Sequence, residues 1–304
     1  MDKIDIELLS QIDDDFHAIE QGSFNIRKNG ESLKRVSNAD IKIITKKDNS
    51  GIDIIINKNV QNKSVHLPVI VTKGGFADVV KNDFYVGENS SVLIVAGCGI
   101  HTSESSKSSH NGEHTFHIAK NAKVVYVEKH LGLGDGEKVL NPKTIIYMKE
   151  NSSLEMQTVQ LGGVSYSNRT TKATLKDNAK LVCVEKILTD EKQVAKTSFN
   201  INLQGKNSSV KVTSRSVAKG NSYQKFVSNV LGNNECFGHV ECDGIIVDNA
   251  IIESAPKVCA KHNLASLVHE AAIGKIAGEQ LIKLQTLGLT EQEAEEEIIK
   301  GFLK

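Results

Sequence analysis

The chain has 304 residues, of which 39% are hydrophobic and 24% charged, so it is long enough to bury a sizeable core and fold as a globular protein. Lys plus Arg and Asp plus Glu number 37 each, which leaves no overall basic field to attract nucleic acid or an anionic membrane surface. No apolar run reaches the roughly 18 residues of a membrane span, and a charged start at Asp2 and Lys3 is unlike a signal peptide, so we expect a cytoplasmic protein. Five scattered cysteines favour free thiols or metal ligands over disulfides.

The N-terminal segment begins with apolar residues at helical spacing, from Ile4 through Leu8, Leu9 and Ile12 to Phe16. This spacing predicts a short amphipathic helix over residues 4–19. We assign residues 1–74 to this helix and a set of leading strands.

The middle of the chain repeats a short phrase that starts with Asn and ends with an apolar residue. It begins at Asn89, Asn121, Asn151, Asn178 and Asn207, at intervals of 32, 30, 27 and 29 residues, with a weaker copy at Asn234. Each copy leads into the alternation of a half-buried strand, and Asn tolerates the left-handed backbone that a tight corner needs. A unit of this size cannot bury its own apolar face, so copies must stack. The sequence therefore predicts a mainly β fold, a β-solenoid over residues 75–266.

A group of metal-ligating side chains lies early in the predicted solenoid, at Cys98, His101, His110, His114 and His117. Alternation along a strand places His114 and His117 on opposite faces, so the group does not converge automatically. A polar loop with histidines beside the core is one interpretation. A metal or partner site is the other.

A second group consists of Cys242, His269 and Glu270, whose thiolate, imidazole and carboxylate are all metal ligands once deprotonated. Residues 242 and 270 are 28 apart, about one solenoid period, so we expect them on successive coils about 4.8 Å apart. The alternative is a buried free cysteine beside an exposed His–Glu pair. A shift of one residue in strand register would turn one partner to the other face.

From Leu267 onward the pattern becomes helical, and we assign residues 267–304 to a helical subdomain that caps the solenoid. Thr290 and Glu293 form a capping box that starts the last helix. The apolar stripe of the first helix consists of Ile273, Ile276, Ala277, Leu281 and Leu284, and that of the last helix of Ala294, Ile298 and Phe302.

The C-terminal third resembles the SufB/SufD family in the order and spacing of its motifs. These are Glu-Cys-Asp-Gly-Ile-Ile at 241–246, Ala-Ser-Leu-Val-His-Glu-Ala-Ala-Ile-Gly-Lys-Ile at 265–276, Glu-Gln-Leu at 279–281, Leu-Gly-Leu-Thr-Glu-Gln-Glu-Ala at 287–294 and Ile-Lys-Gly-Phe at 299–302. The segment 214–222 and the Asn phrases are also similar, so the resemblance covers roughly residues 75–304. His-Glu-Ala at 269–271, where the SufD branch has Ser-His-Gly, places the chain nearer SufB.

The resemblance implies a right-handed parallel β-helix that acts as a non-catalytic scaffold for a transient iron–sulfur cluster. It further implies that residues 267–304 dock a SufC-type ABC ATPase and that Cys242, His269 and Glu270 are the cluster ligands. A homodimer or a SufB–SufD-type heterodimer is expected, with a cysteine desulfurase or sulfur carrier as a further partner. One thiolate with imidazole and carboxylate would hold a cluster less tightly than four thiolates, as suits a donor.

The sequence departs from the family pattern in three places. The long N-terminal region of the larger SufB proteins is missing, Gly244 replaces a motif Ser, and residues 172–175 lack the cysteine expected to receive sulfur. Two rival functions stay open: a SufD-like structural partner that binds no cluster, and a β-helical carbohydrate-active enzyme.

Overall fold

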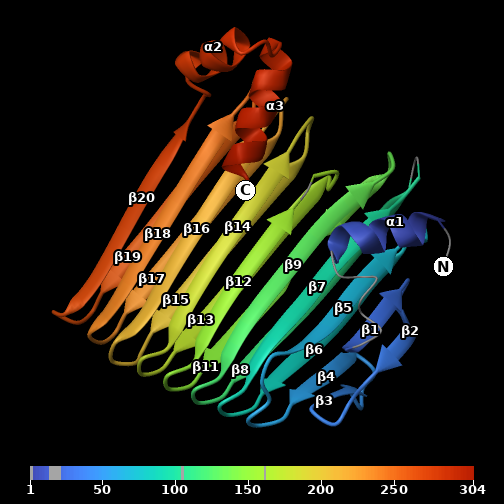
Figure 1. Ribbon diagram of the computed structural model, residues 1–304, viewed down its shortest axis with the longest axis vertical. Coiled ribbons are helices and arrows are strands. Elements are labelled where there is room, and N and C mark those ends of the chain that lie inside the picture. The colour runs from blue at the N-terminus through green and yellow to red at the C-terminus, as the bar shows by residue number, and fades with distance from the viewer. Residues whose placement is uncertain (1–2, 14–21, 104–105, 161) are drawn as a thin grey trace.

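The computed structural model describes residues 3–13, 22–103, 106–160 and 162–304. Two ten-stranded sheets face each other along the molecule, and successive strands alternate between them, so the chain winds as a β-solenoid (Figure 1). One strand of each sheet makes one coil. The predicted mainly β solenoid is thereby confirmed.

The two sheets run side by side from the N-terminal to the C-terminal end of the solenoid. Across sheet A the strands are β2 (Glu31–Val36), β1 (Ser23–Lys28), β5 (Lys63–Val71), β7 (Ser91–His101), β9 (Lys123–Leu133), β12 (Ser153–Gln160), β14 (Lys180–Thr189), β16 (Ser208–Ala218), β18 (Cys236–Ile246) and β20 (Ala265–Gly274). Across sheet B they are β19 (Ile251–Ala260), β17 (Tyr223–Gly232), β15 (Val194–Leu203), β13 (Tyr166–Leu175), then β10 (Glu137–Leu140) and β11 (Lys143–Met148) end to end in one position, β8 (Lys107–Ile118), β6 (Ala77–Val86), β4 (Gly51–Ile56) and β3 (Ile41–Thr45). Among the described strands, only the pairs β1–β2 and β3–β4, at the N-terminal end, are antiparallel.

The repeated Asn residues form a ladder at the turns that lead into sheet A. All five have a left-handed backbone, with φ between 55° and 59°, as predicted. Each donates a side-chain amide hydrogen bond to the Asn one coil earlier, over 2.8 Å from Asn121 to Asn89 and 3.0 Å from Asn178 to Asn151. The ladder begins one coil before the first predicted copy, at Asn59. The weaker copy at Asn234 does not continue it, because its amide is bonded to the backbone oxygen of Gln204.

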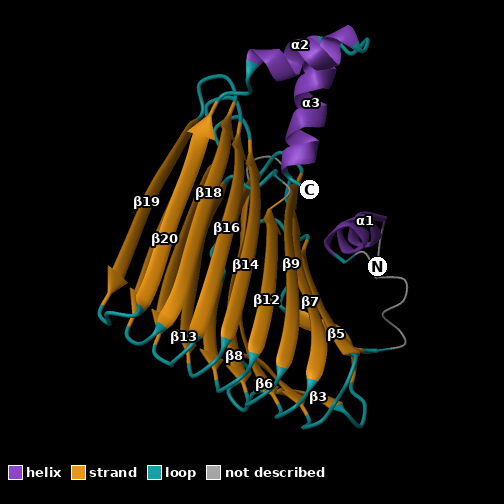
Figure 2. Ribbon diagram, turned by 60° about the vertical axis from the view of Figure 1, so that its left-hand side comes forward, coloured by secondary structure: helices purple, strands orange, loops and turns teal. Residues whose placement is uncertain are grey.

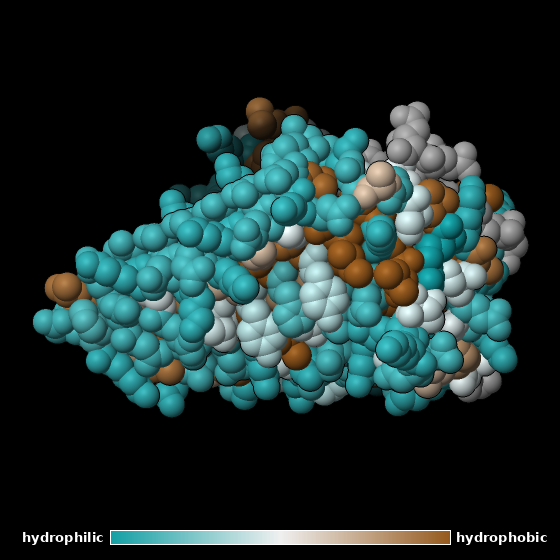
Figure 3. All heavy atoms as spheres, turned by 90° about the horizontal axis from the view of Figure 1, so that it is seen from below, coloured by the Kyte–Doolittle hydropathy of each residue, from teal (hydrophilic) through white to brown (hydrophobic). Residues whose placement is uncertain are grey.

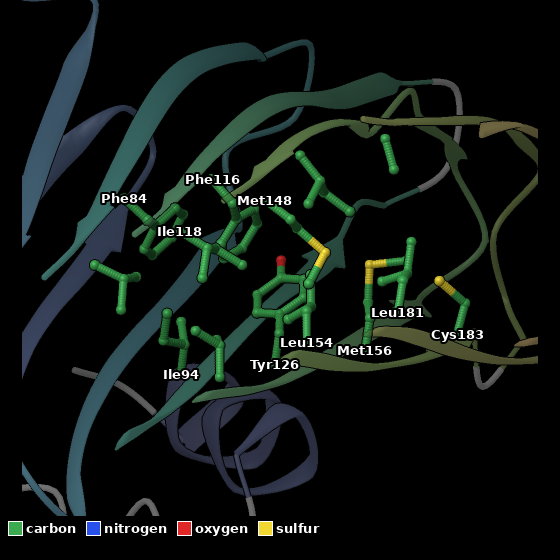
Figure 4. Close-up of a cluster of buried hydrophobic side chains, with 14 of the residues drawn as sticks. Phe84, Ile94, Phe116, Ile118, Tyr126, Met148, Leu154, Met156, Leu181 and Cys183 are labelled. Carbon is green, nitrogen blue, oxygen red and sulfur yellow. The ribbon is translucent and has the colours of Figure 1, made fainter. Parts of the chain in front are cut away.

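The core fills the space between the two sheets, where alternate residues of most strands point inward, and Figure 4 shows a part of it. Phe84 and Phe116 stack on neighbouring strands with ring centroids 4.4 Å apart, and Tyr126 meets Phe116 edge to face. Cys183 lies in this core and is 1% exposed. Such parallel ladders of like side chains bury apolar surface continuously along the axis, which no single coil could do.

The N-terminal helix α1 (Lys3–Ile12) confirms the predicted amphipathic helix over its described part, while residues 14–19 of that prediction lie outside the described residues. It lies across the outer face of sheet A (Figure 1). Leu8 and Ile12 pack against Gly99 and Gly97 of β7, where any larger residue would meet them at 2.9 Å. The parallel ladder already starts where β1 pairs with β5, so the solenoid begins before residue 75.

The C-terminal part differs from the prediction in where it starts and what it covers. Strand β20 continues to Gly274, so the helical region begins at α2 (Gly278–Thr286) and not at Leu267. Helix α3 (Glu291–Phe302) begins with the predicted Thr290–Glu293 capping box. It turns back beside sheet A (Figure 2), where the Phe302 carbonyl accepts a hydrogen bond from Arg215 of β16 at 3.1 Å. Neither helix closes the end of the solenoid.

The last coil, β19 and β20, is therefore open on one side. Its exposed apolar side chains include Ile251, Val258 and Val268, which are 58%, 43% and 38% exposed. The face seen from below is mainly hydrophilic, and its apolar residues gather toward the half that holds the N-terminal strands (Figure 3). Among the described residues, no helix combines the length and apolarity needed to span a bilayer.

Candidate functional site

The strand register places Cys242 opposite Ala271, not opposite Glu270. Glu270 instead faces Glu241, so the predicted pairing of residues 242 and 270 is wrong by one position. Because side chains alternate between the faces of a strand, Cys242 points into the solenoid and Glu270 points out. The interval between paired residues is not constant along the solenoid. Ser214 pairs with Cys242, 28 residues later, whereas Cys242 pairs with Ala271, 29 residues later.

Cys242 lies in the interior of the last two coils and is fully buried. Its neighbour in β16 is Ser214, which is also fully buried. Burial raises the pKa of the Cys242 thiol, because a thiolate is poorly solvated there. The isolated chain therefore holds this residue as a thiol, and a bound metal ion would have to displace its proton.

His269 shares the inner face of the sheet with Cys242, because it pairs with the buried Val240. Burial lowers the pKa of the His269 imidazole, which keeps the ring neutral and its free nitrogen available as a ligand. Its Nε2 atom is buried and makes no hydrogen bond within the described ranges. The structure thus brings Cys242 and His269 to one face of adjacent strands.

Glu270 lies on the outer face of β20, with its side chain 66% exposed. Its carboxylate is 3.6 Å from the Nε2 atom of His239. That nitrogen is buried and has no hydrogen bond in the described structure. His239 was not among the residues predicted from the sequence. The alternation of side chains along a strand could have indicated it, since His239 and Glu241 lie on the face of β18 opposite to Cys242.

The early His group is also divided between two faces. Cys98, His110 and His114 point inward and are buried, whereas His117 points outward between two tyrosines. His101 stands at the end of β7, half-buried. Inside, His110 contacts Asp78 at 2.8 Å, and Asp78 in turn accepts a 2.9 Å hydrogen bond from Arg27.

A buried ionic centre that the sequence analysis did not single out lies between the sheets. Arg169 donates to Glu128 at 2.5 Å and to His130 at 2.7 Å, and its Nε lies 3.6 Å from Glu185. The alternation of side chains could have predicted that Glu128 is buried, because it follows Val124 and Tyr126 on the inner face of β9. The hydroxyl of Thr197 also donates to Glu185, at 3.1 Å.

The charges of this centre shift its pKa values in different directions. Burial raises the pKa of Glu185 to about 7 and lowers that of His130 to about 3. Burial would also raise the pKa of Glu128, but the positive charge of Arg169 holds it well below the usual value. One arginine thus neutralises one of two buried carboxylates, and the second takes up a proton near neutral pH.

No three His, Cys, Asp or Glu side chains in the described part of the chain are grouped closely enough to hold a metal ion. The inner pair Cys242 and His269 and the outer pair His239 and Glu270 each supply two ligand groups. A complete ligand set from these residues would need groups from outside the chain.

Comparison with known proteins places these motifs in a family. The family model described as "SUF system FeS cluster assembly, SufBD core domain" matches residues 69–302. Three proteins named as iron–sulfur cluster assembly SufBD family proteins are similar. That of Methanocaldococcus jannaschii is 28% identical over 82% of this chain and 79% of its own length. That of Archaeoglobus fulgidus is 29% identical over 74% of this chain and 60% of its own length. One from Pyrococcus horikoshii is 27% identical over 86% of this chain and 81% of its own length. The chain belongs to the SufBD family, whose role is in iron–sulfur cluster assembly.

Proposed function

We propose that the protein is a non-catalytic scaffold that carries a transient iron–sulfur cluster while a partner ATPase of the SufC type drives assembly. The observation that carries the proposal is the sharing of one inner face by Cys242 and His269, whose Nε2 atom has no described partner, on the last coils of the solenoid. Thiolate and imidazole suit iron, and a two-ligand set is weak enough to release a cluster.

The remaining ligands would come from a second chain that covers the open coil. Strands β19 and β20 end the two sheets, and each has an unpaired edge among the described strands. Such edges, with exposed apolar side chains beside them, favour pairing with another chain. A homodimer or a SufB–SufD-type heterodimer would bring a second set of ligands to Cys242, and Glu270 would then act from the outer rim.

The ATPase would dock on the C-terminal helices. Helix α2 buries none of its residues, and Ile282 and Leu287 are 60% and 73% exposed. An amphipathic helix with an uncovered apolar side fits the groove of a partner protein. Sulfur would be supplied by a cysteine desulfurase or a sulfur carrier.

Anaerobic reconstitution with iron and sulfide tests the scaffold role. We expect the wild-type protein to gain visible absorbance from a cluster and Cys242→Ser to lose most of it. Cys259→Ser is the matched control, because Cys259 lies on β19, the strand that follows the β18 strand of Cys242, and is only half-buried. An undiminished cluster in Cys242→Ser, at equal protein recovery, would refute the assignment.

A SufD-like structural role is the second candidate. The full burial of Cys242 and the separation of Glu270 from it favour a subunit that stabilises the ATPase complex without holding a cluster. A copurified complex with stimulated ATPase activity but no iron would support this role over the first.

A further inference from the structure

Three rings form a continuous stack on the outer face of sheet B. Tyr85 of β6, His117 of β8 and Tyr147 of β11 are in register on neighbouring strands. The ring centroids of Tyr85 and His117 are 4.9 Å apart and those of His117 and Tyr147 are 5.5 Å apart, with planes within 16° of parallel. The two tyrosines are 41% and 49% exposed, so the stack has free edges.

The stack forms one wall of a groove of about 450 Å³ that we call the ring groove. Val86, Gly87, Ile118 and Ala119 also line it. Gly87 lets the backbone of Lys58 pass close by, since a Cβ at this position would lie 2.5 Å from the Lys58 nitrogen. Lys58 and Lys149 lie at the two ends of the groove. The groove is thus apolar along its length and positively charged at each end.

Two lysines of the ring groove have no ion-pair partner in the described part of the chain. Asp53 and Asp83, on the same sheet face, are both paired with Lys46, the latter at 2.6 Å. Lys58 and Lys149 form no ion pair with any residue that the structure describes. Both cations are therefore available to a ligand.

The geometry selects among anionic ligands. The inner ring faces cover one another, so a nucleobase could not stack between them as it does on a binding platform for single strands. The ring edges and the tyrosine hydroxyls remain accessible to a ligand. The edges suit apolar side chains, and the hydroxyls suit backbone amides. Lys58 and Lys149 follow β4 and β11, three strand spacings apart, which is about 14 Å. An extended chain covers that span with about four or five residues.

We propose that the ring groove binds an extended segment of a partner protein in which acidic residues flank an apolar centre. Apolar side chains of that segment would pack against the ring edges and the apolar lining residues Ile55 and Ala119, and its carboxylates would pair with Lys58 and Lys149. This docking surface is independent of the cluster site at the other end of the solenoid.

A synthetic pentapeptide with glutamate at both ends and Leu-Trp-Leu between them tests the proposal. The protein contains no Trp, so the peptide's tryptophan emission reports binding directly. We expect a saturable change that the double substitution Lys58→Glu and Lys149→Glu weakens at least tenfold. Tyr147→Ser should weaken it as well, because one wall of the groove is lost.

The control is an equal charge change at two exposed lysines outside the groove, Lys192→Glu with Lys261→Glu, which should leave the affinity unchanged. A peptide with lysine ends should not bind. Equal losses in both double variants, binding of the lysine peptide, or binding of anionic vesicles without binding of the acidic peptide would overturn the proposal. Cluster reconstitution should be normal in the Lys58→Glu and Lys149→Glu double variant. A failure of the peptide-binding proposal can therefore be distinguished from a failure of the scaffold proposal.

Discussion

At the scale of single residues, the costliest feature of the molecule is the ionic centre of Glu128, Arg169 and Glu185 inside the solenoid. Burying a charge without a partner costs several kcal/mol, and a single arginine cannot fully compensate two carboxylates. Glu185 reduces this cost by remaining protonated up to a pKa of about 7. Its proton is therefore part of the stable fold.

Glu185 makes stability depend on pH in a definite direction. The folded state holds the proton to about pH 7, whereas the unfolded chain releases it near the ordinary pKa of 4.5. The stabilisation is fully present below pH 4.5 and is lost as the pH rises toward 7, by as much as about 3 kcal/mol. We expect Glu185→Gln to remove this loss, measured by urea unfolding at pH 5 and pH 8.

The comparison with wild type is needed because His130 acts in the opposite direction. Its lowered pKa makes stability rise between about pH 3 and 6.5, and this contribution is common to both proteins. If Glu185→Gln and wild type lost the same stability between the two pH values, the Glu185 carboxyl would not be the group responsible.

At the scale of elements, the Asn ladder marks where β5, β7, β9, β12, β14 and β16 of sheet A begin. Each ladder residue supplies a left-handed corner and a hydrogen bond to the next coil, so a local preference and a long-range contact coincide in one side chain. Such agreement between levels specifies a repeat strongly.

Substitution of one ladder residue separates the two contributions. Asn121→Ala should cost about 1–3 kcal/mol in free energy of unfolding, because Ala is strained in the left-handed region and two side-chain hydrogen bonds are lost. Asn121→Gly keeps the corner and should cost less. Denaturant titration of both checks this.

Asn234→Ala is the control, because the backbone of Asn234 is not left-handed. If Asn234→Ala and Asn121→Ala lowered the free energy of unfolding equally, the left-handed corner conformation would contribute nothing to stability.

At the scale of the whole molecule, the two ends of the solenoid differ. The N-terminal end finishes in antiparallel pairs, while the C-terminal end leaves β19 and β20 open. An uncovered apolar edge is unfavourable in water and favours association.

Disruption of the open end should separate the proposed dimer. We expect Val258→Glu to shift the molar mass measured by light scattering from dimer to monomer, because a carboxylate would be buried without a partner. Val79→Glu is the matched control, since Val79 is 60% exposed on β6, away from that end. A wild-type protein that stays monomeric at high concentration would contradict the proposed assembly.

The solenoid could be predicted from sequence alone, because Asn corners and strand alternation are local and recur in every copy. The same holds for the capping box at Thr290 and the amphipathic character of the N-terminal helix, which depend only on near neighbours. The candidate residues Cys242, His269 and Glu270 were chosen on their chemistry and on family motifs.

Only the tertiary structure decided how those three residues are divided. Turns between coils vary by a residue or more, and one residue reverses the face that a side chain occupies, so a mean period cannot predict register. The buried centre around Arg169 likewise depends on two sheets facing each other, since Arg169 and Glu128 are 41 residues apart in sequence. The path of α3 beside sheet A includes a contact with Arg215, 87 residues before Phe302, which no local pattern indicates.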